Sequence, residues 1–286
     1  MKPAFSTVAC PDWTLDQVVD AARRFGYLGV ELRTEGFGST HNACDPGLSS
    51  ATKVRAMFAA AGVEIICLSS SLRFDDPVTP PVVGNTFVFD QESAVRRGKA
   101  LVDMAVALEV PYVRVFGYET VNNESTNATI ARIANRLGKV VDYARNSGVT
   151  VLLENGGSFE TAGAMKSVLD AINNPLLCAS YSVPVARAAG ERLSHGVLTL
   201  GDKLRVAKFK DLSHGVPCAL GDGDLCASCS FKEVRSSGFK GWAVYEYDRA
   251  YFPELGDPSA ALEASAKTMF GWLNSCCKSC QPAASH

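Results

Sequence analysis

The sequence lacks the features that mark a membrane protein or a nucleic-acid-binding protein. No stretch approaches the roughly 18 consecutive apolar residues of a membrane span. The amino-terminal segment meets Asp12 and Asp16 before any signal-peptide-like apolar run can form. Charges of both signs are interspersed and sum to a net −2, which gives no broad basic surface. These absences predict a cytoplasmic protein that binds a small molecule, with neither nucleic acid nor membrane as a partner.

Histidine is scarce and cysteine is not. Four histidines occur, of which His41 and His214 follow predicted strands. Ten cysteines include two CxxC pairs, Cys226 with Cys229 and Cys277 with Cys280. The long spacer between the pairs is unlike that of a zinc ribbon. Because the cytosol keeps thiols reduced, we expect free thiols rather than disulfides.

Strand-like runs alternate with amphipathic helical segments along the whole chain. This alternation predicts a parallel sheet covered by helices, and eight units in 286 residues favour closure into a (β/α)8 TIM barrel of α/β class. The alternative is an open sheet, but Gly36-Phe37-Gly38 lacks the glycine-rich phosphate turn that such a sheet usually carries. We expect a single domain at 1–275 and a disordered, cysteine-containing tail at 276–286. The predicted strands are 5–9, 29–33, 64–69, 112–116, 150–154, 176–180, 206–210 and 242–246.

Capping motifs and one long loop add detail to this plan. Capping boxes beginning at Thr14 and Ser230 predict two helix starts, and Asp257-Pro258 predicts the start of the last helix. The loop at 73–89 contains several prolines and follows the third strand. Long loops in compact domains are usually functional, so we interpret this one as a substrate cover.

Glu154 and Glu246 end the fifth and eighth predicted strands, where a βα barrel places its catalytic residues. We predict that they form a catalytic pair, the alternative being salt bridges at the barrel mouth. Lys208 and Lys210 alternate along the seventh strand and therefore share a face. If one of these lysines points into the mouth, both can.

Other charged residues are candidates for substrate binding. Arg73 and Arg114 can each hold a carboxylate or phosphate through paired hydrogen bonds, although Arg114 can equally neutralise Glu154 or Glu31. Glu31 and His214 complete the predicted set of binding residues, together with Lys210. For His41 and His214 the alternative is a solvent-exposed loop histidine.

Several of these segments together resemble the sugar phosphate isomerase/epimerase superfamily, whose fold is the xylose isomerase-like barrel. They occur in family order across nearly the whole chain. The matching segments are Gly29-Val30-Glu31-Leu32-Arg33, Ser70-Ser71-Leu72-Arg73-Phe74-Asp75, Pro111-Tyr112-Val113-Arg114-Val115-Phe116-Gly117, Leu152-Leu153-Glu154, Lys210-Asp211, Leu220-Gly221-Asp222-Gly223-Asp224, Gly238-Phe239-Lys240-Gly241-Trp242 and Tyr245-Glu246-Tyr247.

The resemblance implies a divalent metal, Mn²⁺, Mg²⁺, Zn²⁺ or Co²⁺, held by Glu, Asp, His and Glu from the last four strands. Glu154 and Glu246 match the two glutamates. No carboxylate stands in Ala179-Ser180-Tyr181-Ser182, and Lys208 stands where the histidine belongs. A charged lysine has no lone pair for a metal. We therefore predict either no cofactor or a metal at an incomplete site. Without a cofactor, Lys208 would be a catalytic residue in the metal's place, where it polarises a substrate oxygen or acts as an acid or base.

The predicted activity is that of an isomerase or epimerase in carbohydrate metabolism, acting on a sugar, sugar acid or polyol by proton transfer next to a carbonyl. A dehydratase or lyase on a keto-polyol shares the first step, and a non-catalytic sugar-binding barrel is the third alternative. The nuclease branch of this barrel class needs more histidines and a basic surface. Barrels of this family often associate, so the resemblance also allows a homo-oligomer.

Overall fold

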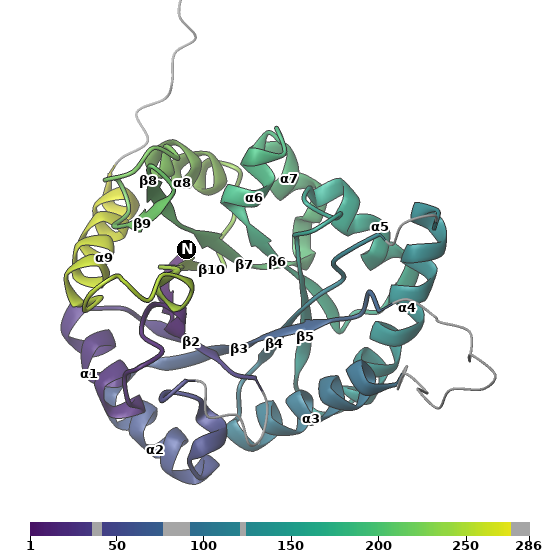
Figure 1. Cartoon of the computed structure of the whole chain (residues 1–286), viewed down its shortest axis with the longest axis horizontal. Helices are drawn as coiled ribbons and strands as arrows, with labels where there is room; N and C mark the ends of the chain where they lie inside the picture. The colour runs from purple at the N-terminus through teal and green to yellow at the C-terminus, as the bar shows by residue number, and fades with distance from the viewer. Residues whose placement is uncertain (36–41, 77–91, 121–123, 276–286) are drawn as a thin grey trace, which may run out of the picture.

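In the computed structural model, which describes residues 1–35, 42–76, 92–120 and 124–275, eight parallel strands close into a barrel in the order β1-β10-β7-β6-β5-β4-β3-β2 (Figure 1). The predicted fold class is therefore confirmed. A short antiparallel hairpin, β8 with β9, follows β7. The barrel strands are β1 (Lys2–Ser6), β2 (Gly29–Arg33), β3 (Glu64–Arg73), β4 (Tyr112–Phe116), β5 (Thr150–Glu154), β6 (Leu177–Ser182), β7 (Leu204–Phe209) and β10 (Trp242–Tyr245), and the hairpin strands are β8 (Asp211–Ser213) and β9 (Val216–Cys218).

Helices surround the barrel as an outer ring (Figure 1). The first of them begins as predicted, because the Gln17 amide donates to Thr14 Oγ1 at 3.4 Å and the Thr14 amide donates to Gln17 Oε1 at 2.8 Å. The described helices are α1 (Leu15–Phe25), α2 (Ala51–Ala61), α3 (Ser93–Leu108), α4 (Thr126–Tyr143), α5 (Ala162–Ile172), α6 (Val183–Ala188), α7 (Leu193–Leu200), α8 (Ala227–Ser236) and α9 (Ser259–Asn274), with single 3-10 turns at Thr7–Ala9, Pro46–Leu48, Gly201–Lys203 and Arg249–Tyr251.

The second predicted capping box is wrong. Helix α8 begins at Ala227, so Ser230 lies inside its first turn. Glu233 instead accepts the Ser194 amide at 2.9 Å near the start of α7 and pairs with Arg187 at 3.2 Å. The Glu233 carboxylate is therefore bound by residues outside α8, although the local pattern predicted that it would cap α8 itself.

Several predicted boundaries shift. The first strand is Lys2–Ser6 rather than 5–9, and β3 runs on to Arg73 rather than ending at 69. The predicted substrate cover at 73–89 and the tail at 276–286 fall almost entirely outside the described residues. No helix of the described ranges is both long enough and apolar enough to cross a bilayer.

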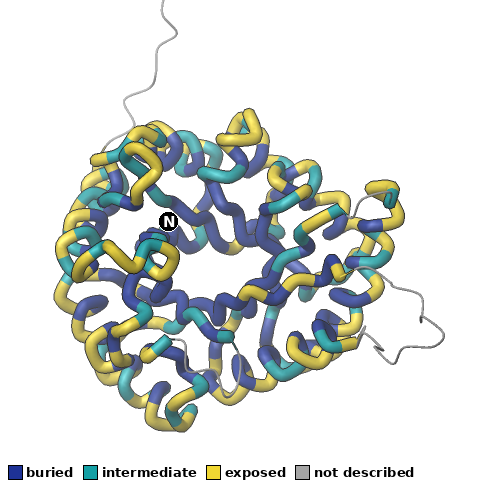
Figure 2. The backbone as a smooth tube through the Cα atoms, in the orientation of Figure 1, coloured by how far each residue is buried: buried dark blue, intermediate teal, exposed yellow. Residues whose placement is uncertain are grey.

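The side chains inside the barrel change from apolar to charged along its axis. Apolar side chains fill the end near the strand amino termini, whereas charged side chains are buried nearer the carboxyl ends, among them Glu31, Arg114 and Lys208. Figure 2 shows the strands as a continuous buried ring inside more exposed helices. The apolar layer comprises Ala4, Ile66, Cys67, Leu152, Cys178, Val206, Trp242 and Val244.

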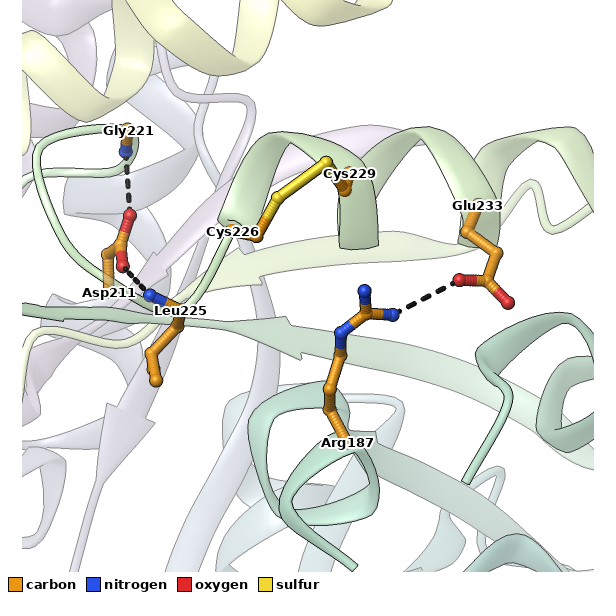
Figure 3. The surroundings of a disulfide bond; sticks show 7 residues. All are labelled: Arg187, Asp211, Gly221, Leu225, Cys226, Cys229 and Glu233. Atoms are coloured by element: carbon orange, nitrogen blue, oxygen red, sulfur yellow. Dashed lines mark hydrogen bonds and ion pairs between the residues drawn. A yellow bond between two sulfur atoms is a disulfide. The ribbon is translucent and has the colours of Figure 1, made fainter. Parts of the chain in front are cut away.

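The prediction of reduced cysteines is wrong for one pair. Cys226 and Cys229 form a disulfide across the first turn of α8 (Figure 3). Their three-residue separation brings the Cα atoms to 5.5 Å, inside the range that a disulfide spans. The other described cysteines are free, namely Cys10, Cys44, Cys67, Cys178 and Cys218.

Glycine 29 gives a test of the apolar layer. A Cβ at this position would lie 2.5 Å from Ile66 Cγ2 and 2.9 Å from Trp242 Cζ3. Gly29→Ala should therefore lower the free energy of unfolding by about 1–3 kcal/mol through overpacking. Gly138→Ala is the matched control, because Gly138 lies in α4 with no atom near a new Cβ, and it should stabilise by about 0.4–1 kcal/mol. Urea unfolding measures both, and equal effects would contradict the packing of this layer.

Candidate functional site

A cavity of about 700 Å³ opens at the carboxyl ends of the barrel strands. Its size is typical of small-molecule sites. Glu154, the last residue of β5, and Glu246, the first residue after β10, both line it. Arg114 from β4 and Lys210, directly after β7, line it as well. The structure thus brings the predicted carboxylate pair to one cavity.

Lys208 lies beneath this cavity rather than in its wall. Its side chain is fully buried inside the barrel and does not line the cavity. Its Nζ is 2.9 Å from Glu31 Oε1, 3.1 Å from Glu154 Oε2 and 3.5 Å from Glu246 Oε1. One ammonium is therefore shared by three carboxylates, two of which continue upward into the cavity.

Arg114 fixes the second side of Glu154. Its Nε lies 3.3 Å from Glu154 Oε2, and its Nη1 donates to the Ser70 carbonyl at 2.6 Å. Ser180, on the neighbouring strand β6, donates its hydroxyl to the same Glu154 oxygen at 2.8 Å. Glu154 is thus held by groups from three different strands. This is the neutralising role foreseen as the alternative for Arg114.

Lys210 is one of the cations that line the cavity, with 19% of its side chain exposed. Its Nζ lies 3.5 Å from Glu246 Oε2 and 2.6 Å from Asp248 Oδ2. Asp248 also lines the cavity, and the sequence analysis missed it. The available signal was its spacing, because Asp248 follows Glu246 by two residues, as Lys210 follows Lys208.

The charges of this cluster shift its proton affinities. Burial raises the pKa of Glu246, yet Lys208, Lys210 and Arg114 outweigh it and hold that pKa well below its usual range. Burial lowers the pKa of both lysines, but the surrounding carboxylates raise it overall. Burial and the neighbouring Glu246 raise the pKa of Asp248. Near neutral pH Glu246 and both lysines are charged, and Asp248 takes up a proton more readily than a free aspartate.

The remaining predicted binding residues divide into two groups. Arg73 lines the cavity, with its guanidinium 5.0 Å from the Tyr118 ring and its Nε 3.7 Å from Asp75. Glu31 is fully buried beside Lys208 and does not line the cavity. His214 is exposed at the turn between β8 and β9, because that hairpin carries it away from the mouth. The structure therefore does not support substrate contact by Glu31 or His214, and His41 lies outside the described residues.

The residues at the mouth do not fit a divalent metal ion. The Lys208 ammonium contacts the carboxylate oxygens that would be ligands, and a charged lysine cannot coordinate. The strand-six position facing Glu154 is Ser180, whose hydroxyl is already used. In the described part of the chain, no group of three or more His, Cys, Asp or Glu side chains is arranged to hold a metal.

Removing the Lys208 charge tests how much the charge cluster contributes to the stability of the fold. Lys208→Met leaves Glu31 and Glu154 buried without their shared cation, so it should destabilise the fold by about 3–5 kcal/mol. Lys166→Met is the control, because its partner Asp170 is an exposed i,i+4 neighbour worth about 0.3–0.5 kcal/mol. Adding Glu31→Gln to Lys208→Met should recover part of the loss. Chemical unfolding measures all three, and equal stability of the two lysine variants would refute the arrangement.

Comparison with known proteins agrees with the barrel. Residues 19–276 match the profile of the xylose isomerase-like TIM barrel family. No curated protein matches the sequence. A solved L-ribulose 3-epimerase shows a TM-score of 0.76 at 14% identity, covering 96% of this chain and 95% of its own.

Two further solved structures show the same likeness. The IOLI protein with a binding zinc atom gives a TM-score of 0.74 at 16% identity, with 96% of this chain and 98% of that chain covered. The probable 3-DHS dehydratase AsbF of Bacillus anthracis gives 0.72 at 16% identity, with 94% and 99% covered. At such identities the likeness is one of fold. The profile match over most of the sequence, on the closed barrel described above, shows that this chain belongs to the xylose isomerase-like TIM barrel family.

Proposed function

We propose that this protein is an isomerase or epimerase of a sugar, sugar acid or polyol that moves a proton on a carbon next to a carbonyl. One observation carries the proposal: Glu154 and Glu246 enter a single cavity from different strands and share one buried cation. Two carboxylates around one substrate are suited to removing a proton and returning one. The epimerases among the structural relatives agree with this class of reaction.

In the proposed reaction Lys210 supports the developing charge. A substrate carbonyl oxygen that approaches the Lys210 ammonium gains a cation where negative charge builds up in an enolate. The same approach draws Lys210 away from Glu246, which removes one of the cations that depress the pKa of Glu246. Binding of the substrate would therefore make Glu246 a better base at the moment it is needed.

Lys208 takes a positioning role in this proposal. From the sequence we assigned it the polarisation of the substrate oxygen. Its complete burial among Glu31, Glu154 and Glu246 supports a different task, which is to hold the two cavity carboxylates in position. Asp248, with its raised pKa, is the group proposed to exchange a proton with the substrate oxygen. The site then works without a metal ion.

A sugar-binding protein without catalysis is the second candidate. It is favoured by the low pKa of Glu246, since a carboxylate so well neutralised is a weak base until a cation leaves. The two candidates share the cavity and differ in whether a substrate proton is exchanged.

Proton exchange separates the candidates. Keto-pentoses, keto-hexoses and their acids, including L-ribulose and D-allulose, are incubated with the protein in ²H₂O and followed by ¹H NMR. We expect loss of the signal next to the carbonyl, slowed by about 10²–10⁴ in Glu154→Gln and Glu246→Gln and unchanged in Lys166→Met. Exchange with a new alkene signal would identify a lyase. A ligand that raises the melting temperature without any exchange would identify a binding protein and overturn the proposal.

Metal retention tests the role given to Lys208. The protein, with Cys226, Cys229, Cys277 and Cys280 changed to Ser so that neither CxxC pair competes for the ion, is loaded with Mn²⁺, Mg²⁺, Zn²⁺ or Co²⁺, desalted and assayed by elemental mass spectrometry. We expect no retained ion, whereas Ser180→Asp with Lys208→His, which restores the family ligand set, should retain about one per chain. About one ion retained by the protein with Lys208 intact and lost in Glu154→Ala would overturn the metal-free site.

A further inference from the structure

The Cys226–Cys229 disulfide lies on the surface, at the start of a helix and apart from the sugar cavity. Both cysteines are exposed, and Cys226 directly precedes the ten-residue helix α8 (Figure 3). Sequence separation within the bridge is three residues, so it closes a very short loop. Short loops gain little stability from a cross-link, because little chain entropy is removed. The disulfide therefore contributes little to the stability of the barrel.

The chemical setting favours exchange instead. The amide groups of the first turn of a helix have no partners within the helix and carry partial positive charge, which stabilises a thiolate there. Accessible disulfides are also the ones that react readily with thiols. The pKa of Cys218, by contrast, is raised to about 11 by burial and by nearby aspartates. Cys218 is therefore a less reactive thiol with which Cys226 can be compared.

A second cavity, of about 320 Å³, adjoins only one of the two sulfur-bearing residues. Cys226 lines it and Cys229 does not. Its walls combine apolar surface from Pro184 and Phe209 with the charged residues Arg187, Lys210 and Asp224. Arg187 pairs with Glu233, and Lys210 pairs with Glu246 and Asp248. Such a cavity offers a small thiol space beside Cys226.

We propose that Cys226 and Cys229 form a thiol–disulfide exchange site for small thiols, with Cys226 as the sulfur that is attacked. An incoming thiolate bonds to Cys226 Sγ, and the bond to Cys229 breaks with its electron pair leaving on Cys229. A second thiolate then attacks the sulfur of the bound thiol and releases Cys226 as a thiolate. Two small thiols become one disulfide, and their two protons pass to the two cysteines. A small disulfide drives the reverse reaction.

The exchange site also connects to the first cavity through the loop before α8. The amides of Leu225 and Gly221 donate to the two carboxylate oxygens of Asp211 at 3.1 and 3.0 Å (Figure 3). Asp211 directly follows Lys210, which lines both cavities. The disulfide fixes the residue next to Leu225, so its reduction should loosen the loop that Asp211 holds. The exchange site does not depend on the sugar chemistry proposed above.

Trapping of a mixed disulfide tests the exchange step. The reduced full chain and its Cys229→Ser and Cys226→Ser variants are treated with glutathione disulfide, quenched in acid and mapped by peptide mass spectrometry. We expect the unmodified protein to close the 226–229 bridge and Cys229→Ser to carry glutathione at Cys226. Labelling of Cys229 in Cys226→Ser, and of Cys218 in any form, should be at least about tenfold lower. Equal labelling of Cys226 and Cys218, or no bridge, would overturn the proposal.

Hydrogen exchange tests the connection to the loop. Peptides covering 219–226 are compared between the oxidised and reduced chain. Faster amide exchange after reduction is expected, together with no response to reductant in the Cys226→Ser/Cys229→Ser double variant. Identical rates in the oxidised and reduced chain would show that the bridge does not control the loop. The double variant should unfold at a somewhat lower denaturant concentration than the oxidised protein, because a cross-link over so short a loop removes less chain entropy than one over a long loop.

Discussion

The burial of one ammonium, that of Lys208, constrains the whole mouth of the barrel. An unpaired charge in this position would be expensive, so carboxylates must meet it from β2, from β5 and from the end of β10. Those carboxylates in turn require Arg114 and Lys210. Because the pKa of Glu246 is depressed, its ionisation stabilises the fold above its unfolded pKa of about 4.3, and this contribution is lost as the pH falls below that value.

Much of this arrangement was predictable, because it follows from periodicity. Alternation of strands and helices predicted the barrel, and two-residue alternation placed Lys208 and Lys210 on one face. How deeply each lysine is buried could not be predicted in this way. A strand pattern tells which residues point inward, but not that Lys208 lies under the carboxylates while Lys210 reaches the cavity. Asp248 was missed although it repeats the two-residue spacing of Lys208 and Lys210, because it lies beyond the end of the last predicted strand.

The two departures from prediction have different physical origins. Glu233 matched a capping box, yet it satisfies the amide of Ser194 on another helix, and α8 starts four residues earlier than that pattern predicts. His214 was a candidate for the mouth because it follows the seventh strand, with a solvent-exposed loop position as the alternative. The β8–β9 hairpin, a local pairing of residues 211–213 with 216–218, places it in solvent. A tertiary contact therefore decided the first outcome and a local hairpin the second.

An ammonium in the place of a metal ion changes what the site can offer a substrate. A bound divalent ion can accept a substrate oxygen as an extra ligand. The Lys208 ammonium is closed off by three carboxylates and has no face toward the cavity. A substrate oxygen that needs a cation must therefore use one in the cavity wall, and the nearest along the chain is Lys210, whose partners Glu246 and Asp248 lie in the same cavity. The proposed proton transfer therefore takes place above Lys208, beside Lys210. The next residue, Asp211, anchors the loop that leads to Cys226.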